Sequence, residues 1–453
     1  MNSDPVTSSR SSRAAVQSPL RVACFVPAFN AGETTRGIEL CRGLVAAGLE
    51  RGREVMARLA YPTSDCDYEP QIAASGFEAQ RLKLHLDEAS VAGIMAADHE
   101  GKEFISDLDT ARRFIRAIMD EILAWRPDLI LCGFVPPVAI AAKILKVPTV
   151  VYLPFPAYRP WVRRHLLKDI PDEFDNAVTS RAPKPLRQAL AKLLSLGALT
   201  SGFFRQPTFA SAGRELGWRD AAADVIAMLS APLQLVTDLP VFYEGEDVGP
   251  NTRITGPLFS RPTEVSVRPE IRSLFAVGAQ DRVFVSMGSS GEKPYLLAGI
   301  EALATMQLRA VVVVPPHVCS LSEVCEKFHM PSHVLLTDSF VPAQQVNAMA
   351  DAAIIHGGQG TVQTAISSGT PIVGVGMQAE QTRNLENVIC RGAAIRLRKR
   401  EWTPENIREA LSRVLEVPSF RESAVRLKAL ADATDGRQEA GRAILEFAAR
   451  SGL

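Results

Sequence analysis

The sequence lacks both a net charge and any pattern of paired cysteines. Its 453 residues include fifty lysines and arginines and fifty aspartates and glutamates, so the formal net charge is zero. A neutral chain has no overall field to hold a nucleic acid, and we expect no nucleic-acid partner. Seven cysteines are scattered without a Cys-x-x-Cys pair, at positions 24, 41, 66, 132, 319, 325 and 390. This spacing argues against a disulfide framework or a zinc site and favours free thiols in a reducing cytoplasm.

Long apolar runs are absent as well. No stretch approaches the ~20 apolar residues that a membrane-spanning helix needs, so we expect no transmembrane segment. Residues 1–19 are rich in Ser and Arg but have no apolar core of the kind found in secretion signals, and they are predicted to form a disordered tail. We therefore expect a cytoplasmic protein. A chain of this length predicts two domains of roughly 200 residues each.

Short apolar runs alternate with helical patterns in both halves of the chain. The runs lie at 21–27, 54–59, 128–132, 149–153 and 233–237, and again at 282–287, 310–314, 333–337 and 352–356. Because these runs have no polar face, they are typical of parallel strands covered by helices on both sides. The sequence thus predicts an α/β fold with two Rossmann-like, doubly wound parallel-sheet domains that face a cleft.

Changes in composition suggest where these domains begin and end. We expect an N-terminal domain over 20–238, a linker over 239–251 that is rich in Pro, Gly and acids, and a C-terminal domain over 252–432. A last helical pattern over 433–453 could cross back to the first domain. Residues 155–220 interrupt the alternation with Pro, Trp, Phe and several basic residues. They could be a solvated helical insertion, or a surface for an anionic or lipid-linked substrate with peripheral membrane contact.

The segment 352–384 carries the most chemical information. A buried strand ends at His356, a turn with three glycines follows, and Thr361 opens a helix. The three glycines are Gly357, Gly358 and Gly360. Because the turn has no Cβ at these positions, a ligand can approach the backbone closely. The free N–H groups and the helix dipole would face an anion at this corner, where doubly wound sheets bind their ligands.

A second loop follows the next predicted strand at the same edge of the sheet. It places Glu380 beside Gln381, and a carboxylate next to an amide suits hydrogen bonding to sugar hydroxyls. The run His-Gly-Gly-x-Gly-Thr, then Gly-x-Pro, then Glu-Gln-x-x-Asn resembles the donor signature of family-one, UDP-glycosyltransferase-like enzymes of the GT-B fold. The resemblance implies that the C-terminal domain binds a nucleotide-sugar donor and the N-terminal domain binds the acceptor.

The resemblance also assigns roles to single residues. His356, the glycine turn and Thr361 would face the diphosphate, together with Gly288 and Ser289 after an earlier strand. Glu380 and Gln381 would hold the sugar, and Asn384 would support the motif. The segment around Val341 would meet the base with its backbone. The expected donor-binding residues are thus Gly288, Ser289, Val341, His356, Gly357, Gly358, Gly360, Thr361, Glu380, Gln381 and Asn384.

Two departures from the family pattern bear on the donor. Thr364 stands where the family often has a glutamate that binds the ribose hydroxyls, and threonine also occurs there in relatives that use thymidine-diphosphate deoxysugars. The resemblance therefore implies a UDP-sugar or a TDP-sugar as the donor. Gly376 stands where the signature usually has a proline before the Glu-Gln loop.

A third departure concerns the acceptor side. Family members place a histidine base after a glycine in the first strand-helix turn, whereas here Glu33 follows Gly32. A buried carboxylate can accept a hydroxyl proton, so Glu33 is the expected catalytic residue. The alternative is that Glu33 only stabilises the helix N-terminus, whose dipole would also lower its pKa. Arg36 could instead hold an acidic acceptor or a phosphate.

Together these features predict a glycosyltransferase that moves a sugar from a nucleotide-diphosphate donor to a hydroxyl of a small-molecule or lipid acceptor. We expect inverting transfer with no metal and no cofactor besides the nucleotide sugar. One alternative is a sugar-nucleotide epimerase or hydrolase on the same fold. Another is a non-catalytic nucleotide-sugar-binding or activator protein that lost the base.

Overall fold

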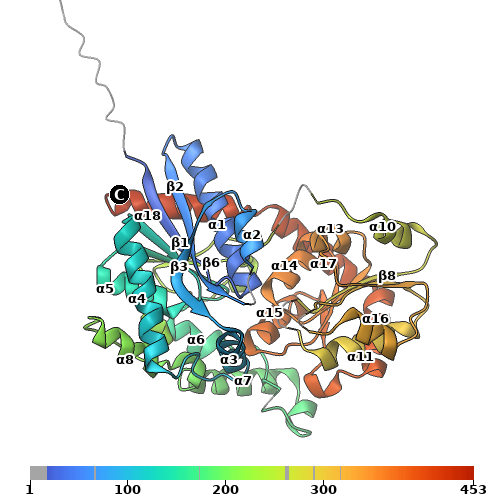
Figure 1. Cartoon of the computed structure of the whole chain (residues 1–453). Coiled ribbons are helices and arrows are strands. Elements are labelled where there is room, and N and C mark those ends of the chain that lie inside the picture. Colours follow the sequence, from blue (N-terminus) through green and yellow to red (C-terminus); the bar gives the residue numbers. More distant parts are fainter. Residues whose placement is uncertain (1–17, 66–67, 173, 261–264, 289–290, 317) are drawn as a thin grey trace, which may run out of the picture.

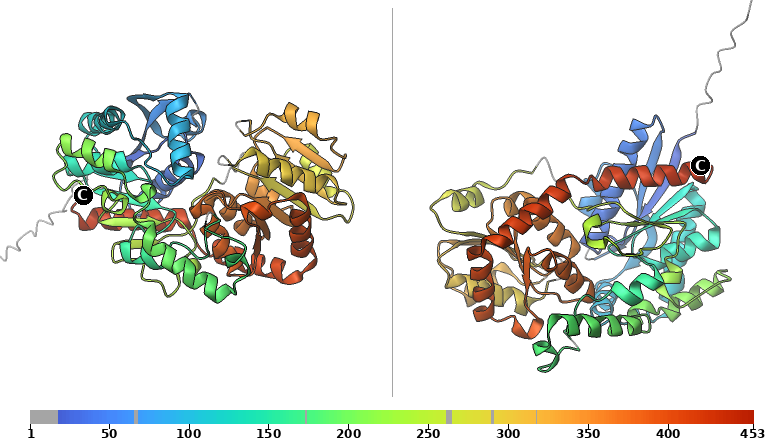
Figure 2. Two further views of the ribbon diagram at one scale, coloured as in Figure 1. Left: turned by 90° about the horizontal axis from the view of Figure 1, so that it is seen from below. Right: turned by 180° about the vertical axis from the view of Figure 1, so that it is seen from behind.

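A computed structural model describes residues 18–453, apart from 66–67, 173, 261–264, 289–290 and 317 (Figure 1). The chain forms two α/β halves that lie side by side (Figure 2). Each half contains one parallel sheet with helices on both faces, as the alternation in the sequence predicts.

The first sheet has seven parallel strands in the order β3-β2-β1-β4-β5-β6-β7. Its central strands are buried throughout, which explains their uniformly apolar sequences. The strands are β1 (Leu20–Phe25), β2 (Val55–Ser64), β3 (Glu78–Leu86), β4 (Leu129–Cys132), β5 (Thr149–Leu153), β6 (Leu233–Val236) and β7 (Thr252–Ile254). The helices of this half are α1 (Ala31–Glu50), α2 (Glu69–Ala73), α3 (Glu88–His99), α4 (Leu108–Trp125), α5 (Pro136–Leu145), α6 (Arg159–His165), η1 (Thr179–Arg181), α7 (Lys184–Ala198), η2 (Gly202–Phe204), α8 (Pro207–Glu215), α9 (Val225–Met228) and η3 (Pro240–Tyr243).

The second sheet has six parallel strands in the order β10-β9-β8-β11-β12-β13. Its strands are β8 (Arg282–Ser286), β9 (Arg309–Val313), β10 (Val334–Thr337), β11 (Ala352–Ile355), β12 (Ile372–Gly374) and β13 (Ala394–Arg396). The helices are α10 (Pro269–Ala276), α11 (Lys293–Ala304), α12 (Leu321–Lys327), α13 (Ala343–Asn347), α14 (Gln359–Ser368), α15 (Ala379–Ile389), η4 (Lys399–Glu401), α16 (Pro404–Glu416), α17 (Pro418–Asp432) and α18 (Gly436–Arg450). None of the helices in the described residues is long and apolar enough to cross a membrane.

The structure places the boundary between the two halves later in the chain than the sequence predicts. The sequence places a linker at 239–251 and the second domain from 252, but β7 pairs with β6 and so belongs to the first sheet. The chain leaves the first half only after Ile254. The edge strand has three residues and follows a loop rich in Pro and Gly, so its sequence carries almost no periodic signal.

The last helix, α18, returns to the first half. It lies along α1 (Figures 1 and 2), and its apolar face joins the core that contains strand residues such as Val22 and Leu131. The backbones of the two helices touch at Gly43 and Gly441. A Cβ on Gly43 would lie 2.1 Å from the Arg437 carbonyl oxygen, and one on Gly441 would lie 2.2 Å from the Gly43 oxygen. Only glycine allows this approach.

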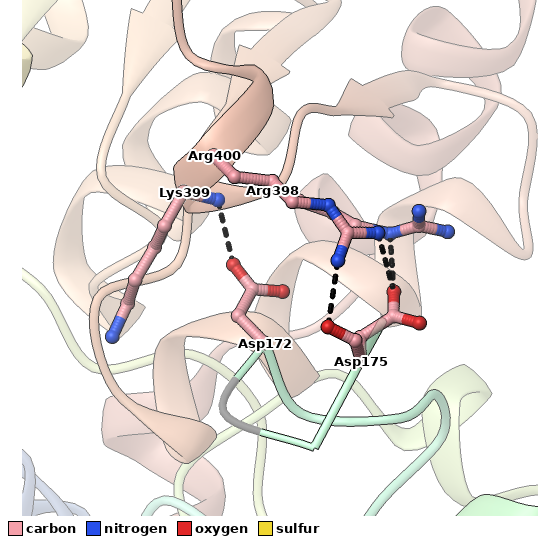
Figure 3. A pocket seen from close by; sticks show the side chains of 5 residues that line it. All are labelled: Asp172, Asp175, Arg398, Lys399 and Arg400. Carbon is pink, nitrogen blue, oxygen red and sulfur yellow. Dashed lines mark hydrogen bonds and ion pairs between the residues drawn. The ribbon is translucent and has the colours of Figure 1, made fainter. Parts of the chain in front are cut away.

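A network of charged side chains joins the loop after α6 to β13 and η4. The Arg396 side chain is 4% exposed and pairs with Asp169, Asp172 and Glu386. Figure 3 shows the neighbouring part of the network, where Asp172 and Asp175 face residues 398–400 around a cavity of about 230 Å³. Since the aspartates belong to the first half and the arginines to the second, these ion pairs tie the halves together.

The insertion at 155–220 is mostly helical, with α6, α7 and α8 among its elements. Part of its positive charge is used within the fold. Arg187 is buried in ion pairs with Asp169 and Asp175, and Arg159 pairs with Asp224. On α6, the Trp161 ring lies beneath the guanidinium of Arg383 from α15, at 4.5 Å. This contact also joins the two halves.

Candidate functional site

Each sheet has one switch point, where successive strands stop being added on one side of the sheet and start being added on the other. In the second sheet this point lies between β8 and β11, where Ile355 pairs with Ser286. In the first sheet it lies between β1 and β4. Doubly wound sheets bind ligands beyond the carboxyl ends of strands at such points. The residues that follow these four strands therefore define the candidate site.

His356 directly follows β11 and lies in a slot between two glycines. A Cβ on Gly288 would lie 2.3 Å from the ring Cε1, and a Cβ on Gly358 would lie 2.4 Å from Nε2. Burial lowers the pKa of His356 to about 4, while a hydrogen bond with the Ser286 backbone acts in the opposite direction. The imidazole is therefore neutral at pH 7. Its buried Nδ1 has no hydrogen-bond partner among the described residues.

Helix α14 begins beside this histidine at Gln359, two residues before Thr361, the start predicted from the sequence. Gly358 is its N-cap, no side chain caps it, and the first helical bond runs from the Val362 N–H to the Gly358 carbonyl. The N–H groups of residues 359–361 therefore lack acceptors in the part of the chain that the structure describes. Thr361 donates its hydroxyl to the Gly358 carbonyl at 2.8 Å. The dipole and the unpaired N–H groups make this corner suitable for a diphosphate.

Two alanine substitutions should show that Gly358 packs against the His356 ring and that Gly360 faces open space. In Gly358→Ala the new Cβ meets the His356 ring, so we expect the melting temperature of the free protein to fall. In Gly360→Ala the Cβ meets nothing within 4 Å, so the free protein should be as stable as wild type. Overpacking of this kind costs about 1–3 kcal/mol. Differential scanning fluorimetry of the two variants without ligand tests this, and equal melting temperatures would contradict the slot.

The second predicted loop leads into α15 and is linked to the glycine turn. Asn384 donates to the Gly357 carbonyl at 3.1 Å and to Glu380 at 2.9 Å. Gln381 accepts from the Met377 N–H at 2.9 Å and donates to Gln378 at 3.0 Å. Burial raises the pKa of Glu380, against the hydrogen bond from Asn384. Asn384 thus fixes the carboxylate at the same edge as His356.

Three predicted positions need separate comment. Ser289 lies outside the described residues. Val341 packs its side chain into the core with Phe284 and Val311, so only its backbone could meet a ligand. Thr364 is 9% exposed and donates its hydroxyl to the Thr361 carbonyl at 2.9 Å, within its own helix.

On the opposite side, Glu33 lies in the first turn of α1, which Asn30 caps. One Glu33 oxygen pairs with the Arg36 guanidinium, and the other accepts from the Phe134 N–H at 3.4 Å. Phe134 follows β4, so the charge pair sits at the switch point of the first sheet. Both oxygens of Glu33 are thus engaged, which makes it less available as a base than the sequence suggests.

Hydrogen bonds bring the two switch points into contact. Arg36 donates to the Gln359 side chain at 2.6 Å, in the first turn of α14. Gln359 and Gln363 both donate to the Thr237 carbonyl after β6, at 3.1 and 2.7 Å. The positive charge of Arg36 therefore lies beside the N-terminus of α14. Burial lowers the pKa of Arg36, but the negative charges of Glu33 and Glu380 outweigh burial and raise the pKa above its usual value.

The structure adds Asp98, which the sequence analysis did not single out. This residue lies near the end of α3, and its Oδ2 accepts from Gln378 at 2.9 Å across the two halves. Its Oδ1 has no hydrogen-bond partner among the described residues. Burial raises the pKa of Asp98 to about 6, and the charges of Glu380 and Glu33 act in the same direction. No motif marks this position, because only the docking of the halves brings it to the site.

A cluster of aromatic rings borders Glu33. Phe134 stacks on Phe203 with centroids 5.2 Å apart, and Phe104 meets both rings edge-on. Phe104 comes six residues after Asp98. All three rings are partly exposed, so they offer an apolar surface beside the charged groups.

Two Asp-x-Asp pairs occur in the chain, at 65–67 and 107–109, and they qualify the expectation that no metal takes part. Such carboxylates can hold Mg²⁺ on a diphosphate. Asp107 caps α4 and Asp109 pairs with Arg112 and Arg113, so this pair serves the helix. Asp65 faces His85, and Asp67 lies outside the described residues.

Comparison with known proteins supports the second half most directly. Residues 306–446 match the family model for the erythromycin biosynthesis protein CIII-like C-terminal domain. UDP-glycosyltransferase 2 of Phaeomoniella chlamydospora is 33% identical over 170 residues, which are 37% of each chain. The 4'-demethylrebeccamycin synthase of Lentzea aerocolonigenes is 29% identical over 44% of this chain and 46% of its own. The matched part thus spans less than half the length of these curated relatives.

Solved structures match nearly the whole chain. The glycotransferase of kitacinnamycin has a TM-score of 0.65 at 22% identity, covering 95% of this chain and 99% of its own. Glycosyltransferase VinC in complex with DTDP has a TM-score of 0.64 at 20% identity, covering 95% and 100%. Residues 306–446 are thus similar to the EryCIII-like C-terminal domain, and the whole chain shares the fold of these two solved glycosyltransferases, the GT-B fold.

Proposed function

We propose that this protein is a glycosyltransferase that moves a sugar from a TDP- or UDP-sugar to a hydroxyl of a small-molecule or lipid acceptor, with inversion and without a metal. The observation that carries the proposal is the meeting of the two switch points. The uncapped N-terminus of α14 and neutral His356 lie opposite Arg36, Glu33 and an aromatic surface. The six described cysteines are all free thiols, which supports a cytoplasmic setting.

In this proposal the leaving diphosphate lies at the start of α14. The N–H groups of residues 359–361 and the His356 ring stabilise its growing charge, and fixed donors of this kind supply the largest catalytic effect. Glu380 and Gln381 hold the sugar hydroxyls. The Phe104, Phe134 and Phe203 surface holds an apolar acceptor. A TDP-sugar fits Thr364 better than a UDP-sugar does. Thr364 has no carboxylate to bind the two hydroxyls of a ribose, and the deoxyribose of TDP carries only one of these two hydroxyls.

Asp98 takes the acceptor proton in this mechanism. The acceptor O–H bond breaks toward Asp98, the oxygen bonds to the anomeric carbon, and the bond from that carbon to the diphosphate breaks on the other side. Glu33 instead holds Arg36 in place. Asp98 suits the task because one of its oxygens is unpaired among the described residues and its pKa of about 6 leaves it ionised yet basic at pH 7.

Nucleotide binding and acceptor-dependent turnover test the function itself. At about 100-fold excess over its dissociation constant, TDP should stabilise the wild-type protein by about 2.7 kcal/mol. GDP should give a smaller shift, and Gly360→Ala should weaken the TDP shift. With a panel of TDP- and UDP-sugars and flat aromatic alcohols, nucleotide release should require the acceptor. Absence of any nucleotide shift, or an isomerised donor formed without acceptor, would overturn the proposal.

The pH profile tests the role of Asp98. The active form is the carboxylate, so kcat/KM should rise with pH through about 6 and then level off. In Asp98→Asn this limb should disappear and the rate should fall about 10²–10⁴-fold. A phenol that is already ionised at the assay pH needs no base and should still be glycosylated. Glu88→Gln, on an exposed part of the same helix, is the control. If Glu33→Gln removed the limb and Asp98→Asn kept it, Glu33 would be the base.

A further inference from the structure

Exposed apolar side chains gather on one part of the first half. Fourteen large apolar side chains are exposed in the described residues, and five of them lie between 174 and 196. Those five are Phe174 (62% exposed), Val178 (80%), Leu186 (52%), Leu193 (63%) and Leu196 (55%). A single exposed leucine is ordinary, but a cluster of this kind indicates an interaction surface.

The leucines share one face of α7. Leu186, Leu193 and Leu196 recur at the spacing that places residues on the same side of a helix, and Ala189 between them is exposed too. The opposite side of the helix packs inward through Arg187, Ala191 and Ser195, which are buried. Helix α7 is therefore anchored to the protein and presents its leucines outward.

In the segment that contains these leucines, the exposed charges of the described residues are all positive. Between 160 and 200 the exposed charged side chains, within the described residues, are Arg163, Arg164, Arg181, Lys184 and Lys192, and none of them forms an ion pair with a described residue. The described acids of the same segment are Asp169, Asp172 and Asp175, which pair with Arg187, Arg396 and Arg398. The basic-apolar face, meaning these five cations and the five apolar side chains, thus carries positive charge, and the described residues of the segment add no exposed acid to it.

We infer that the basic-apolar face docks the protein on the surface of an anionic lipid bilayer. Leucine and phenylalanine side chains would enter the boundary between headgroups and acyl chains, and the lysines and arginines would meet the lipid phosphates. Charge complementarity favours an anionic bilayer over a second copy of the chain, because the exposed cations of two copies would repel each other. The inference does not depend on the proposed transfer reaction, since it concerns binding alone.

Vesicle co-sedimentation of the full chain tests the inference. We expect binding to equimolar phosphatidylglycerol and phosphatidylcholine vesicles, little binding to pure phosphatidylcholine, and weaker binding as salt rises. Each cation near an anionic surface contributes about a fivefold change in partitioning, so Lys184→Glu with Lys192→Glu should reduce binding at least about 25-fold. Leu193→Glu should reduce it as well. Both sets change exposed side chains, so their melting temperatures should match wild type.

A matched control is Leu49→Glu, which changes a leucine that is 77% exposed on α1. This variant should bind vesicles like wild type. Absence of binding to anionic vesicles would overturn the inference, as would equal binding of Leu193→Glu and wild type. A wild-type dimer that becomes a monomer in Leu193→Glu, measured by light scattering without lipid, would also overturn it in favour of a second copy of the chain.

Discussion

Replacing Arg396 with alanine should lower the free energy of unfolding by about 3–5 kcal/mol, because it strands buried carboxylates. The Arg396 side chain is 4% exposed and pairs with Asp169, Asp172 and Glu386, at 2.7, 3.1 and 2.9 Å. Of these acids, Glu386 has no other ion-pair partner among the described residues. Urea unfolding followed by fluorescence would measure the change. The loss should persist at high salt, because buried pairs are screened little.

The matched control is Arg391→Ala. Arg391 also crosses between the halves, but it is exposed and pairs with Glu244, whose side chain is 68% exposed. Exposed pairs contribute about 0–1 kcal/mol, so this variant should unfold nearly like wild type. Equal losses for Arg391→Ala and Arg396→Ala would show that burial does not set the strength of the network.

The contact between α1 and α18 should be as sensitive as this ion-pair network. In Gly43→Ala the new Cβ would lie 2.1 Å from the Arg437 carbonyl oxygen, and backbone cannot rotate away as a side chain can. We expect the free energy of unfolding to fall by about 3 kcal/mol, the upper end of the overpacking cost. The displaced helix would also expose residues such as Ile444, so proteolysis should remove the C-terminus faster.

A glycine-to-alanine substitution should instead raise the free energy of unfolding where the new Cβ points into open space. In Gly299→Ala, within α11, the Cβ meets nothing within 4 Å. Alanine is the better helix former, so we expect a gain of about 0.5–1 kcal/mol. Thermal unfolding of both variants would measure the difference. Equal stability of Gly43→Ala and wild type would contradict the close approach of the two backbones.

The sequence predicts the strand, turn and helix around His356 well because their signal is local. His356 follows its strand directly, and the glycine turn and helix start come next in the chain. Thr149–Leu153 is found as a strand with the predicted bounds, and most other buried strands agree within a residue or two. Uniformly apolar runs between helices leave few alternatives, because a parallel sheet covered by helices buries both faces of such strands.

Features that depend on distant parts of the chain were not predictable in this way. Asp98 acquires its setting from Gln378 and Glu380, almost three hundred residues away. The ion pair of Glu33 with Arg36 has the i,i+3 spacing of a helix and can be read from the sequence. The hydrogen bond that the second Glu33 oxygen accepts from the Phe134 N–H cannot, because Phe134 is about a hundred residues away. Strand β3 (Glu78–Leu86) is absent from the predicted strands because the prediction rests on uniformly apolar runs, although the alternation of buried leucines with exposed residues is a strand signal as well.

The chain passes between the halves twice, once after Ile254 and once before α18. The two passages touch, since a Cβ on Gly436 would lie 2.4 Å from the Pro257 oxygen and one on Gly256 would lie 2.4 Å from Thr434 Cγ2. The two chain crossings therefore join the halves along a single line. A motion that kept these crossings in place would turn the halves about that line, and it would separate His356 from Glu33 only by breaking the hydrogen bond from Arg36 to Gln359.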